Sequence, residues 1–381
     1  MDDIWYFPPQ RSMKERLLWL TDVIRCRSAE QRIATRNTPR TELSFNYQFD
    51  ENQVHIAQEI SKVYGASTIK VPFWHELTAV AKLETGQTEV NIRTVGKRYV
   101  EGSYAFVIDG SNRFELVKVK SISSNRLTFE SPGILYGYVN CHIMPCHVGH
   151  FNSSFNYEKF PAHYNTGEAS FIFEQDFGIG NGNPFPSYLD SYVVTDRPIV
   201  DGSINDSSER EYTGFDSISG PIYYSEDYTY SISSSSLVWS FDSFEASLAL
   251  RKWFNLVKGK QGSFYCARFT RDFTAQGGIA TGDSAIVAHT RTRTLSNYVG
   301  PICVLLKTGQ QYFFNVTAIE SANSAMQRLI LAQDSTVNIP AQSIELISVM
   351  TRMRLNSDIV EFNFKSGGSV DIRLPIMEVP Q

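Results

Sequence analysis

The residues best suited to chemistry are cysteines and histidines gathered in one short stretch of the chain. Thiolate sulfur and imidazole nitrogen are ligands that zinc prefers, and ligands four to five residues apart can reach one ion. The run that carries them is strand-like, however, and a strand sends neighbouring side chains to opposite faces. We therefore expect structural residues and no bound metal, with a zinc site as the weaker alternative. The candidate ligands are Cys141, His142, Cys146, His147, His150 and His163.

The patterns of common catalytic sites are missing from the sequence. It contains no G-x-S-x-G nucleophile elbow and no H-E-x-x-H motif. The glycine-rich run 178–182 lacks the third glycine of a dinucleotide loop and the Gly-Lys-Ser/Thr of a nucleotide loop. The runs 74–76 and 270–272 occupy matching strand ends but carry different residue types, as capping or salt-bridging residues would. We expect no enzyme and no cofactor.

Basic residues form local patches on a chain whose net charge is −5. The overall charge argues against a protein whose whole surface grips nucleic acid. Basic patches that face acidic neighbours would speed and orient subunit docking, which is the interpretation we favour. A plain solvated surface and a surface facing nucleic acid are the alternatives. The candidate subunit contacts are Arg25, Arg27, Arg36, Arg40, Lys258, Lys260, Arg268 and Arg271.

Elements of similar order and spacing occur twice, at 43–130 and again at about 237–332. Each copy starts with an alternating strand, continues into a helix that stops at a glycine, and then enters a second strand. Short strands with polar turns follow in both copies, as in a small barrel or sandwich. Because little residue identity accompanies this order, we infer two related domains rather than a short-period solenoid. A chance likeness between two unrelated β-rich domains is the alternative. The matching elements are strands 43–49 and 237–241, helices 51–64 and 245–258, and strands 69–74 and 264–269.

The flanking segments complete the predicted organisation. Ser12 and Glu15 form a capping box, and apolar residues at helical spacing extend the predicted helix to Val23 or Ile24. The stretch from about 175 to 236, rich in Gly, Ser, Asn and Tyr, is too long for an ordinary loop and is interpreted as a crossover draped over a surface. The expected parts are a helix and basic connector (1–42), a first domain (43–87 with 151–175), its barrel (88–150), the crossover (176–236), a second domain (237–278 with 351–381) and its barrel (279–350).

Composition supports a β-rich α+β protein with a few helices. The 381 residues allow two or three domains, and the 25 Phe and 19 Tyr favour sheet over helix. No apolar run reaches the roughly 18 residues that a membrane-spanning helix needs, and the N-terminus does not read as a signal peptide. Five cysteines are an odd number, so we expect free, mostly buried thiols in a protein made in a reducing cytoplasm.

Three stretches of the sequence, 15–40, 71–74 and 251–272, resemble distal tail and tail-tip hub-type proteins of long-tailed bacteriophages. The start at 15–40 is similar to the N-terminal sequence of that family, and Val71-Pro72-Phe73-Trp74 is similar to its first strand after the helix. In the second half, the run 251–272 is similar to the family's helix–Gly–basic–Gly–aromatic–strand ending. The likeness touches both halves, but it carries no catalytic signature. Cys266-Ala267-Arg268 departs from the family's usual strand, and two tube-type domains in one chain are more than the family commonly has.

The resemblance implies a structural virion protein made in the bacterial cytoplasm and placed at the phage tail tip or baseplate. It implies two tube-type β-sandwich-plus-helix domains, each with a small β-barrel that projects outward. Three chains would form a ring with pseudo-six-fold symmetry; a hexamer is the competing geometry. The implied partners are the tail tube, tape measure, hub and fibre proteins, with no membrane, and with DNA only passing through the channel. A receptor- or carbohydrate-binding module of the tail tip is the alternative function, and a tail-associated hydrolase is a third.

Overall fold

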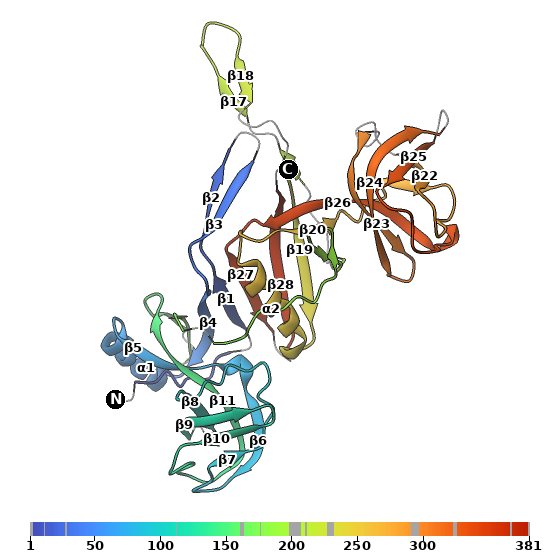
Figure 1. The fold of residues 1–381 in the computed structure, drawn as a ribbon. Helices are drawn as coiled ribbons and strands as arrows, with labels where there is room; N and C mark the ends of the chain where they lie inside the picture. The colour runs from blue at the N-terminus through green and yellow to red at the C-terminus, as the bar shows by residue number, and fades with distance from the viewer. Residues whose placement is uncertain are drawn as a thin grey trace.

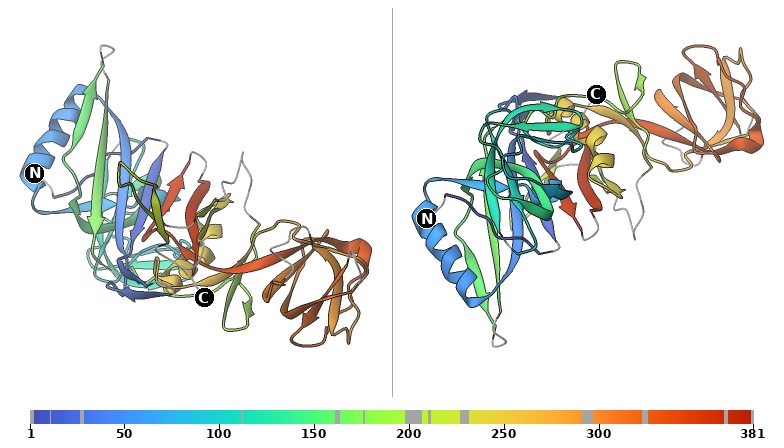
Figure 2. Two further views of the ribbon diagram at one scale, coloured as in Figure 1. Left: turned by 90° about the horizontal axis from the view of Figure 1, so that it is seen from above. Right: turned by 90° about the horizontal axis from the view of Figure 1, so that it is seen from below.

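The computed structural model shows an elongated, mainly β protein in which one small barrel stands apart from the rest of the molecule (Figure 1). The β-rich fold class expected from the sequence is confirmed. Figure 2 shows the first helix and the detached barrel at opposite ends of the long axis. The structure describes residues 3–10, 12–26, 29–111, 113–160, 164–175, 177–197, 207–209, 212–226, 232–290, 297–322, 326–365 and 368–379.

The first half contains an antiparallel sheet covered by a helix. Its elements are β4 (Arg40–Phe49), α1 (Glu51–Tyr64), β5 (Thr68–Pro72), β11 (Tyr138–Phe151), β12 (Asn156–Lys159) and β13 (Asn165–Phe173). The strands pair in the order β4–β13–β11–β5, and β12 forms a hairpin with β13. Val54, Ala57 and Ile60 of α1 join the core that the sheet buries, so the amphipathic face predicted from the sequence packs as expected.

The second half contains a sheet of the same kind. Its elements are β19 (Ile232–Phe241), α2 (Leu248–Val257), β20 (Phe264–Ala267), β26 (Ile344–Leu355), β27 (Ile359–Phe364) and β28 (Val370–Glu378). The strands pair in the order β19–β28–β26–β20, and β27 forms a hairpin with β28. Leu250, Trp253 and Phe254 of α2 pack into its core.

The two halves therefore share one topology, strand for strand. In each, a ten-residue strand precedes the helix and pairs along the last strand of that half. Each sheet also receives a parallel addition at its far edge. Ile4 bridges Lys70 of β5 in the first half, and β15 (Ser191–Val194) pairs in parallel with β20 in the second.

Each half inserts a six-stranded barrel between its second strand and its long strand. The barrel strands are β6 (Thr78–Leu83), β7 (Glu89–Val90), β8 (Tyr104–Ile108), β9 (Phe114–Ser123), β10 (Arg126–Phe129), β21 (Phe273–Ala275), β22 (Ala285–Thr290), β23 (Gly300–Leu306), β24 (Gln311–Ser321) and β25 (Gln327–Leu331). The first barrel pairs in the order β6–β11–β8–β9–β10–β7. The second repeats this order as β21–β26–β23–β24–β25–β22 and closes through β22 and β21. The long strands β11 and β26 run from each barrel into its sheet (Figure 1).

The predicted N-terminal helix is wrong. Residues of the expected helix form β1 (Met13–Leu18) and β2 (Thr21–Arg25), and the basic connector contributes β3 (Glu30–Ala34). The first of these strands buries alternate residues, Glu15 and Leu17, and lies between two strands from opposite halves of the chain. Pairing on both edges satisfies the backbone and overrides the local helical pattern.

The predicted crossover contains more secondary structure than expected, and its strands belong partly to the second sheet and partly to a separate hairpin. It contains β14 (Ser187–Tyr188), β15, β16 (Ser207–Glu209), β17 (Tyr212–Phe215) and β18 (Tyr223–Glu226). β15 and β16 pair with β20 and β19, so they belong to the second sheet, and that half begins well before residue 237. β17 and β18 form a separate hairpin, which projects from the same side of the molecule as the β2–β3 hairpin (Figure 1).

Several boundaries differ by a few residues from the sequence predictions. The strand expected at 69–74 ends at Pro72 and is followed by a 3-10 turn, Trp74–Glu76; that expected at 264–269 ends at Ala267. The helix expected from 245 starts with a 3-10 turn at Glu245–Ser247. A further 3-10 turn is Ala341–Ser343. The barrels begin at β6 and β21 rather than at residues 88 and 279. In each half, the strand that follows the second sheet strand pairs with the long strand, β11 or β26, and so belongs to the barrel.

Candidate functional site

The junction between the two halves is the best-defined site in the molecule, and it is built around β1. All six residues of β1 pair antiparallel with β4 on one side, from Met13↔Phe45 to Leu18↔Arg40. The same six residues pair with β27 on the other side, from Met13↔Phe364 to Leu18↔Ile359. One sheet therefore runs without a break from the first half into the second.

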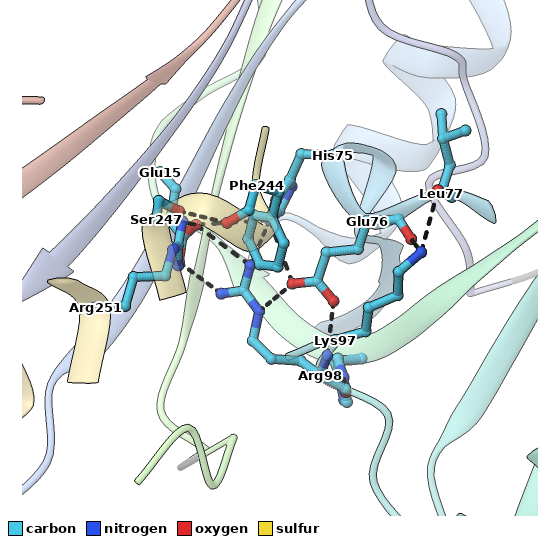
Figure 3. Close-up of polar contacts among 10 residues, drawn as sticks. Glu15, His75, Glu76, Leu77, Lys97, Arg98, Phe244, Ser247 and Arg251 are labelled. Carbon is cyan, nitrogen blue, oxygen red and sulfur yellow. Dashed lines mark hydrogen bonds and ion pairs between the residues drawn. The ribbon is translucent and has the colours of Figure 1, made fainter. Parts of the chain in front are cut away.

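A fully buried carboxylate, Glu15, lies at the centre of this junction between two buried arginines (Figure 3). Arg251 of α2 donates from Nη2 to Oε2 at 2.6 Å and from Nη1 to Oε1 at 3.0 Å. Arg98, from the segment before β8, donates from Nη1 to Oε1 at 2.6 Å and from Nη2 to Oε2 at 3.3 Å. Two-pronged contacts of this kind fix geometry as well as charge. The cluster joins β1, the first barrel and the second helix.

A second carboxylate balances the second arginine. Arg98 donates from Nε to Oε1 of Glu76 at 2.5 Å and from its backbone N to Oε2 at 2.7 Å. The Nη2 of Arg98 also contacts Nε2 of His75. The same ring nitrogen lies 3.5 Å from Oε1 of Glu76 and 3.6 Å from Oε2 of Glu15. Lys97 extends the cluster by donating to the backbone oxygens of Glu76 and Leu77, at 3.0 and 3.3 Å.

The charges in the cluster determine its ionisation. Burial would raise the pKa of Glu15, but Arg251 and Arg98 outweigh it and hold that pKa well below its usual range. Burial would likewise raise the pKa of Glu76, yet Arg98 leads the groups that lower it to about 2. Burial lowers the pKa of His75. At neutral pH two carboxylates therefore face two guanidinium groups, and the buried charges balance.

Aromatic rings enclose the two guanidinium groups. The Arg251 guanidinium carbon lies 3.9 Å from the centre of the Phe362 ring and 4.7 Å from that of Phe244. That of Arg98 lies 4.6 Å from the centre of the Phe73 ring. These rings exclude water from the cluster. The exclusion strengthens each ion pair and raises the free-energy cost of leaving a buried charge unpaired. A site of this kind fixes the relative position of the elements that carry it.

Further contacts extend the junction along β1 and the β2–β3 hairpin. Arg16 donates from Nε to Glu361 at 2.7 Å and lies 3.3 Å from Glu42, so it bridges β27 and β4. Arg354 of β26 donates from Nε to the buried carboxylate of Glu30 at 2.7 Å. The Asp358 carboxylate accepts hydrogen bonds from Thr21. The N-terminal strands are thus tied to the second half at several points.

The structure separates the candidate metal ligands. Cys141 lies in the core of the first barrel and Cys146 in the core of the first sheet, although both belong to β11. His147 points to the other face, where Nε2 donates to the Arg98 carbonyl at 2.6 Å, and His150 is exposed. No group of three or more metal-ligating side chains occurs among the described residues, and His163 lies outside them. All five cysteines are free thiols and four of them are buried, as expected.

Four of the eight basic candidates, Arg36, Arg40, Lys258 and Lys260, lie near residues 18–21. Arg36 donates to the Leu18 carbonyl at 3.2 Å, and Arg40 pairs with Glu174 at 2.9 Å. The backbone of Lys260 donates to Asp358 beside β1, with Lys258 two residues earlier at the end of α2. Of the other candidates, Arg25 is half-buried on β2, Arg268 and Arg271 are exposed before the second barrel, and Arg27 lies outside the described residues.

The residues that make the junction were not predicted from the sequence as a site. Glu15 belongs to the capping box of the predicted N-terminal helix, and Arg98 has no motif around it. Arg251 carried the one usable signal, because it lies four residues after the buried Ser247 and three before the buried Phe254. That spacing places a charge on the apolar face of a helix, where it requires a partner.

Neither helix in the described part of the chain is long and apolar enough to span a membrane. No protein-family model matches this sequence, and the search of curated proteins found no match to it either.

Proposed function

We propose that this chain is a structural component of a phage tail tip or baseplate, where it forms a ring that joins the tail tube to the hub or receptor-binding apparatus. One observation carries the proposal: the two halves have the same strand order and are joined edge to edge through β1. Two copies of one fold that follow each other head to tail are what two neighbouring positions in a ring require.

The resemblance of residues 15–40 and 251–272 to tail-tip proteins supports the proposal that this ring belongs to a phage tail. In such a ring the sheets form the wall, the helices α1 and α2 brace it, and the barrels extend outward towards fibres or other baseplate proteins. Three chains supply six near-equivalent positions, which would adapt a six-fold tube to a three-fold hub. Six chains, with one half of each turned outward, form the competing ring.

The purified full-length chain tests this function by native mass measurement and negative-stain electron microscopy. The proposal expects a closed oligomer with a central opening, seen as rings in end-on views. A chain that stays monomeric at high concentration, or that forms open chains of variable length, contradicts it.

A receptor- or carbohydrate-binding role is the alternative, and the β17–β18 hairpin favours it. Tyr212, Phe215, Tyr223 and Tyr224 on this hairpin are all more than half exposed, at 62%, 66%, 69% and 59%. Exposed aromatic groups that project from the body of a protein mark binding surfaces. A glycan array decides this: specific binding that the Tyr223→Ser/Tyr224→Ser variant loses supports the alternative, and an array without hits removes it.

A further inference from the structure

The internal repeat extends to the segments that precede β4 and β19. In the first half, β1, the β2–β3 hairpin and β4 follow one another; in the second, β16, the β17–β18 hairpin and β19 do the same. The registers also agree. Leu18 of β1 lies opposite Arg40, the first residue of β4, and Glu209 of β16 lies opposite Ile232, the first residue of β19. β16 is therefore the counterpart of β1.

The hairpin strands β27 and β12 correspond in the same way. Phe362 lies opposite Ile372, which in turn lies opposite Trp239, the eighth residue of β19. Tyr157 lies opposite Gly167, which lies opposite Tyr47, the eighth residue of β4. Tyr157 thus occupies the position of Phe362, and Asn156 that of Glu361.

Two strands, β16 and β12, each have one edge without a partner among the described strands, whereas the same edge of the corresponding strand, β1 or β27, is paired. β1 pairs with β4 on one edge and β27 on the other, whereas β16 pairs with β19 alone in the described part of the chain. β27 pairs with β28 and β1, whereas β12 pairs only with β13 among the described strands. Ser207, Ser208 and Asn156 are exposed on these edges. An open strand edge presents unpaired backbone donors and acceptors that suit another strand.

We propose that β16 of one chain pairs antiparallel with β12 of a second copy of this chain, and so repeats between chains the β1–β27 junction found within one chain. The inference rests on the proposed ring and names the edges that close it. The contact is heterologous, because the two strands differ, and such contacts propagate around a ring until it closes. A second copy of this chain is the expected partner, because the repeat places both strands in the register of the β1–β27 junction.

The internal junction also fixes the register between chains. Arg16 lies opposite Glu361 within the chain. Ser207 stands two residues before Glu209, as Arg16 stands two before Leu18, so Ser207 occupies the position of Arg16. Ser207 should therefore face the partner subunit's Asn156. Directly opposed residues of antiparallel strands lie about 4.5–5.5 Å apart at Cα, a distance that a disulfide spans.

Cysteine cross-linking tests the pairing in the full-length chain with the exposed Cys26 replaced by serine. The Ser207→Cys/Asn156→Cys variant should form disulfides between chains under mild oxidation, giving covalent dimers and then the closed ring on non-reducing gels. Ser207→Cys/Lys159→Cys, which is displaced by three residues, is the matched control and should cross-link at least tenfold less. Lys14→Cys/Asn363→Cys, whose two positions are already opposed, should cross-link within one chain and leave the mass unchanged.

Native mass measurement of the reduced variants separates the two possible failures. A ring that forms but gives no 207–156 cross-link above the displaced control overturns the edge assignment and leaves the proposed function standing. A chain that remains monomeric overturns both. Hydrogen exchange provides the second readout: the amides of Asn156–Lys159 should become protected in the oligomer, and unchanged exchange there contradicts the pairing.

Discussion

Glu15 and Arg251 are 236 positions apart in the sequence, yet their side chains meet in a two-pronged buried ion pair that joins the first strand to the second helix. Arg98 approaches the same carboxylate from the first barrel. Three parts of the chain are therefore fixed relative to one another by one carboxylate. If the two halves occupy neighbouring positions in a ring, this cluster sets the angle between them.

Removing one member of the pair should destabilise the protein strongly. Arg251→Met leaves Glu15 with one partner and the cluster with an excess negative charge, at an expected cost of about 3–5 kcal/mol. The measurement is urea unfolding followed by tryptophan fluorescence. Removing both members in Glu15→Leu/Arg251→Met leaves Arg98 paired with Glu76 and should restore a large part of the loss.

The partly exposed pair of Arg16 and Glu361, whose side chains are 36% and 30% exposed, provides the matched control for that experiment. Glu361→Gln should cost no more than about 1 kcal/mol, because solvent screens this pair and Arg16 keeps its contact with Glu42. Equal effects of Arg251→Met and Glu361→Gln would show that the buried cluster does not hold the junction.

Acidification should destabilise the fold before any carboxylate of the cluster is protonated. Burial lowers the pKa of His147 from 6.5 to about 4, and burial also lowers that of His75. As pH falls, the unfolded chain binds these protons first, so the contribution is complete above about pH 6.5 and disappears towards pH 4. For His147 alone the loss reaches about 3 kcal/mol. Glu15 and Glu76 add to it only below their ordinary pKa of 4.5.

The test compares the free energy of unfolding at pH 7, 5.5 and 4. In His147→Gln, the amide can still donate to the Arg98 carbonyl, and the fall between pH 7 and pH 4 should be smaller than in the unsubstituted protein. His150→Gln, at an exposed position of the same strand, should leave the fall unchanged. An unaltered pH dependence in His147→Gln would contradict the assignment.

The strand character of the N-terminal segment can be tested by comparing two leucines. Leu17 is buried in the core of the second half, whereas Leu20 is 45% exposed. Leu17→Ala should cost about 2–5 kcal/mol, and Leu20→Ala should change stability by no more than about 0.5 kcal/mol. In the amphipathic helix expected from the sequence both residues would share one face, so equal costs in urea unfolding would favour the helix over the strand.

The β17–β18 hairpin should behave as a locally weak element. Two strands without further neighbours are marginally stable in water, and this hairpin exposes its aromatic rings. Its amides at 212–226 should exchange with solvent much faster than those of the adjoining β19, which is paired along its length with β28. Mass-detected hydrogen exchange of the monomer measures this, and equal protection of both segments would contradict it.

The sequence predicted the two helices and the repeated order of strand, helix and strand, because interactions between residues close in the chain determine these features. The periodic apolar residues of α1 and α2 identified both helices, and Asp50 with Gln53 completes a reciprocal cap at the start of α1. The repeated order of strand, helix and strand is present because each half builds its own core. Gly259 lies in the left-handed region at the end of α2, whereas Gly65 ends α1 in a right-handed conformation, where the Ser61 carbonyl oxygen leaves no room for a Cβ atom.

Distant pairing explains what the sequence could not predict. Residues 13–18 have the spacing of a helix, but β4 and β27 lie on either side of them, and β27 starts more than 300 residues later. The same is true of Glu15, Arg98 and Arg251, because none of these residues has its partner on the same element. β15 and β16 were missed because short strands within a segment rich in Gly, Ser and Asn resemble loops until the sheet that receives them is known.

Native mass spectrometry of the purified full-length chain tests the central claim most directly. If one chain supplies two successive segments of a closed ring, the spectrum should be dominated by a complex of three 43.1 kDa chains, which carries six repeats. A complex of six chains would support a closed ring but would show six-fold instead of three-fold geometry. A spectrum that contains only the single chain at every concentration would contradict the account.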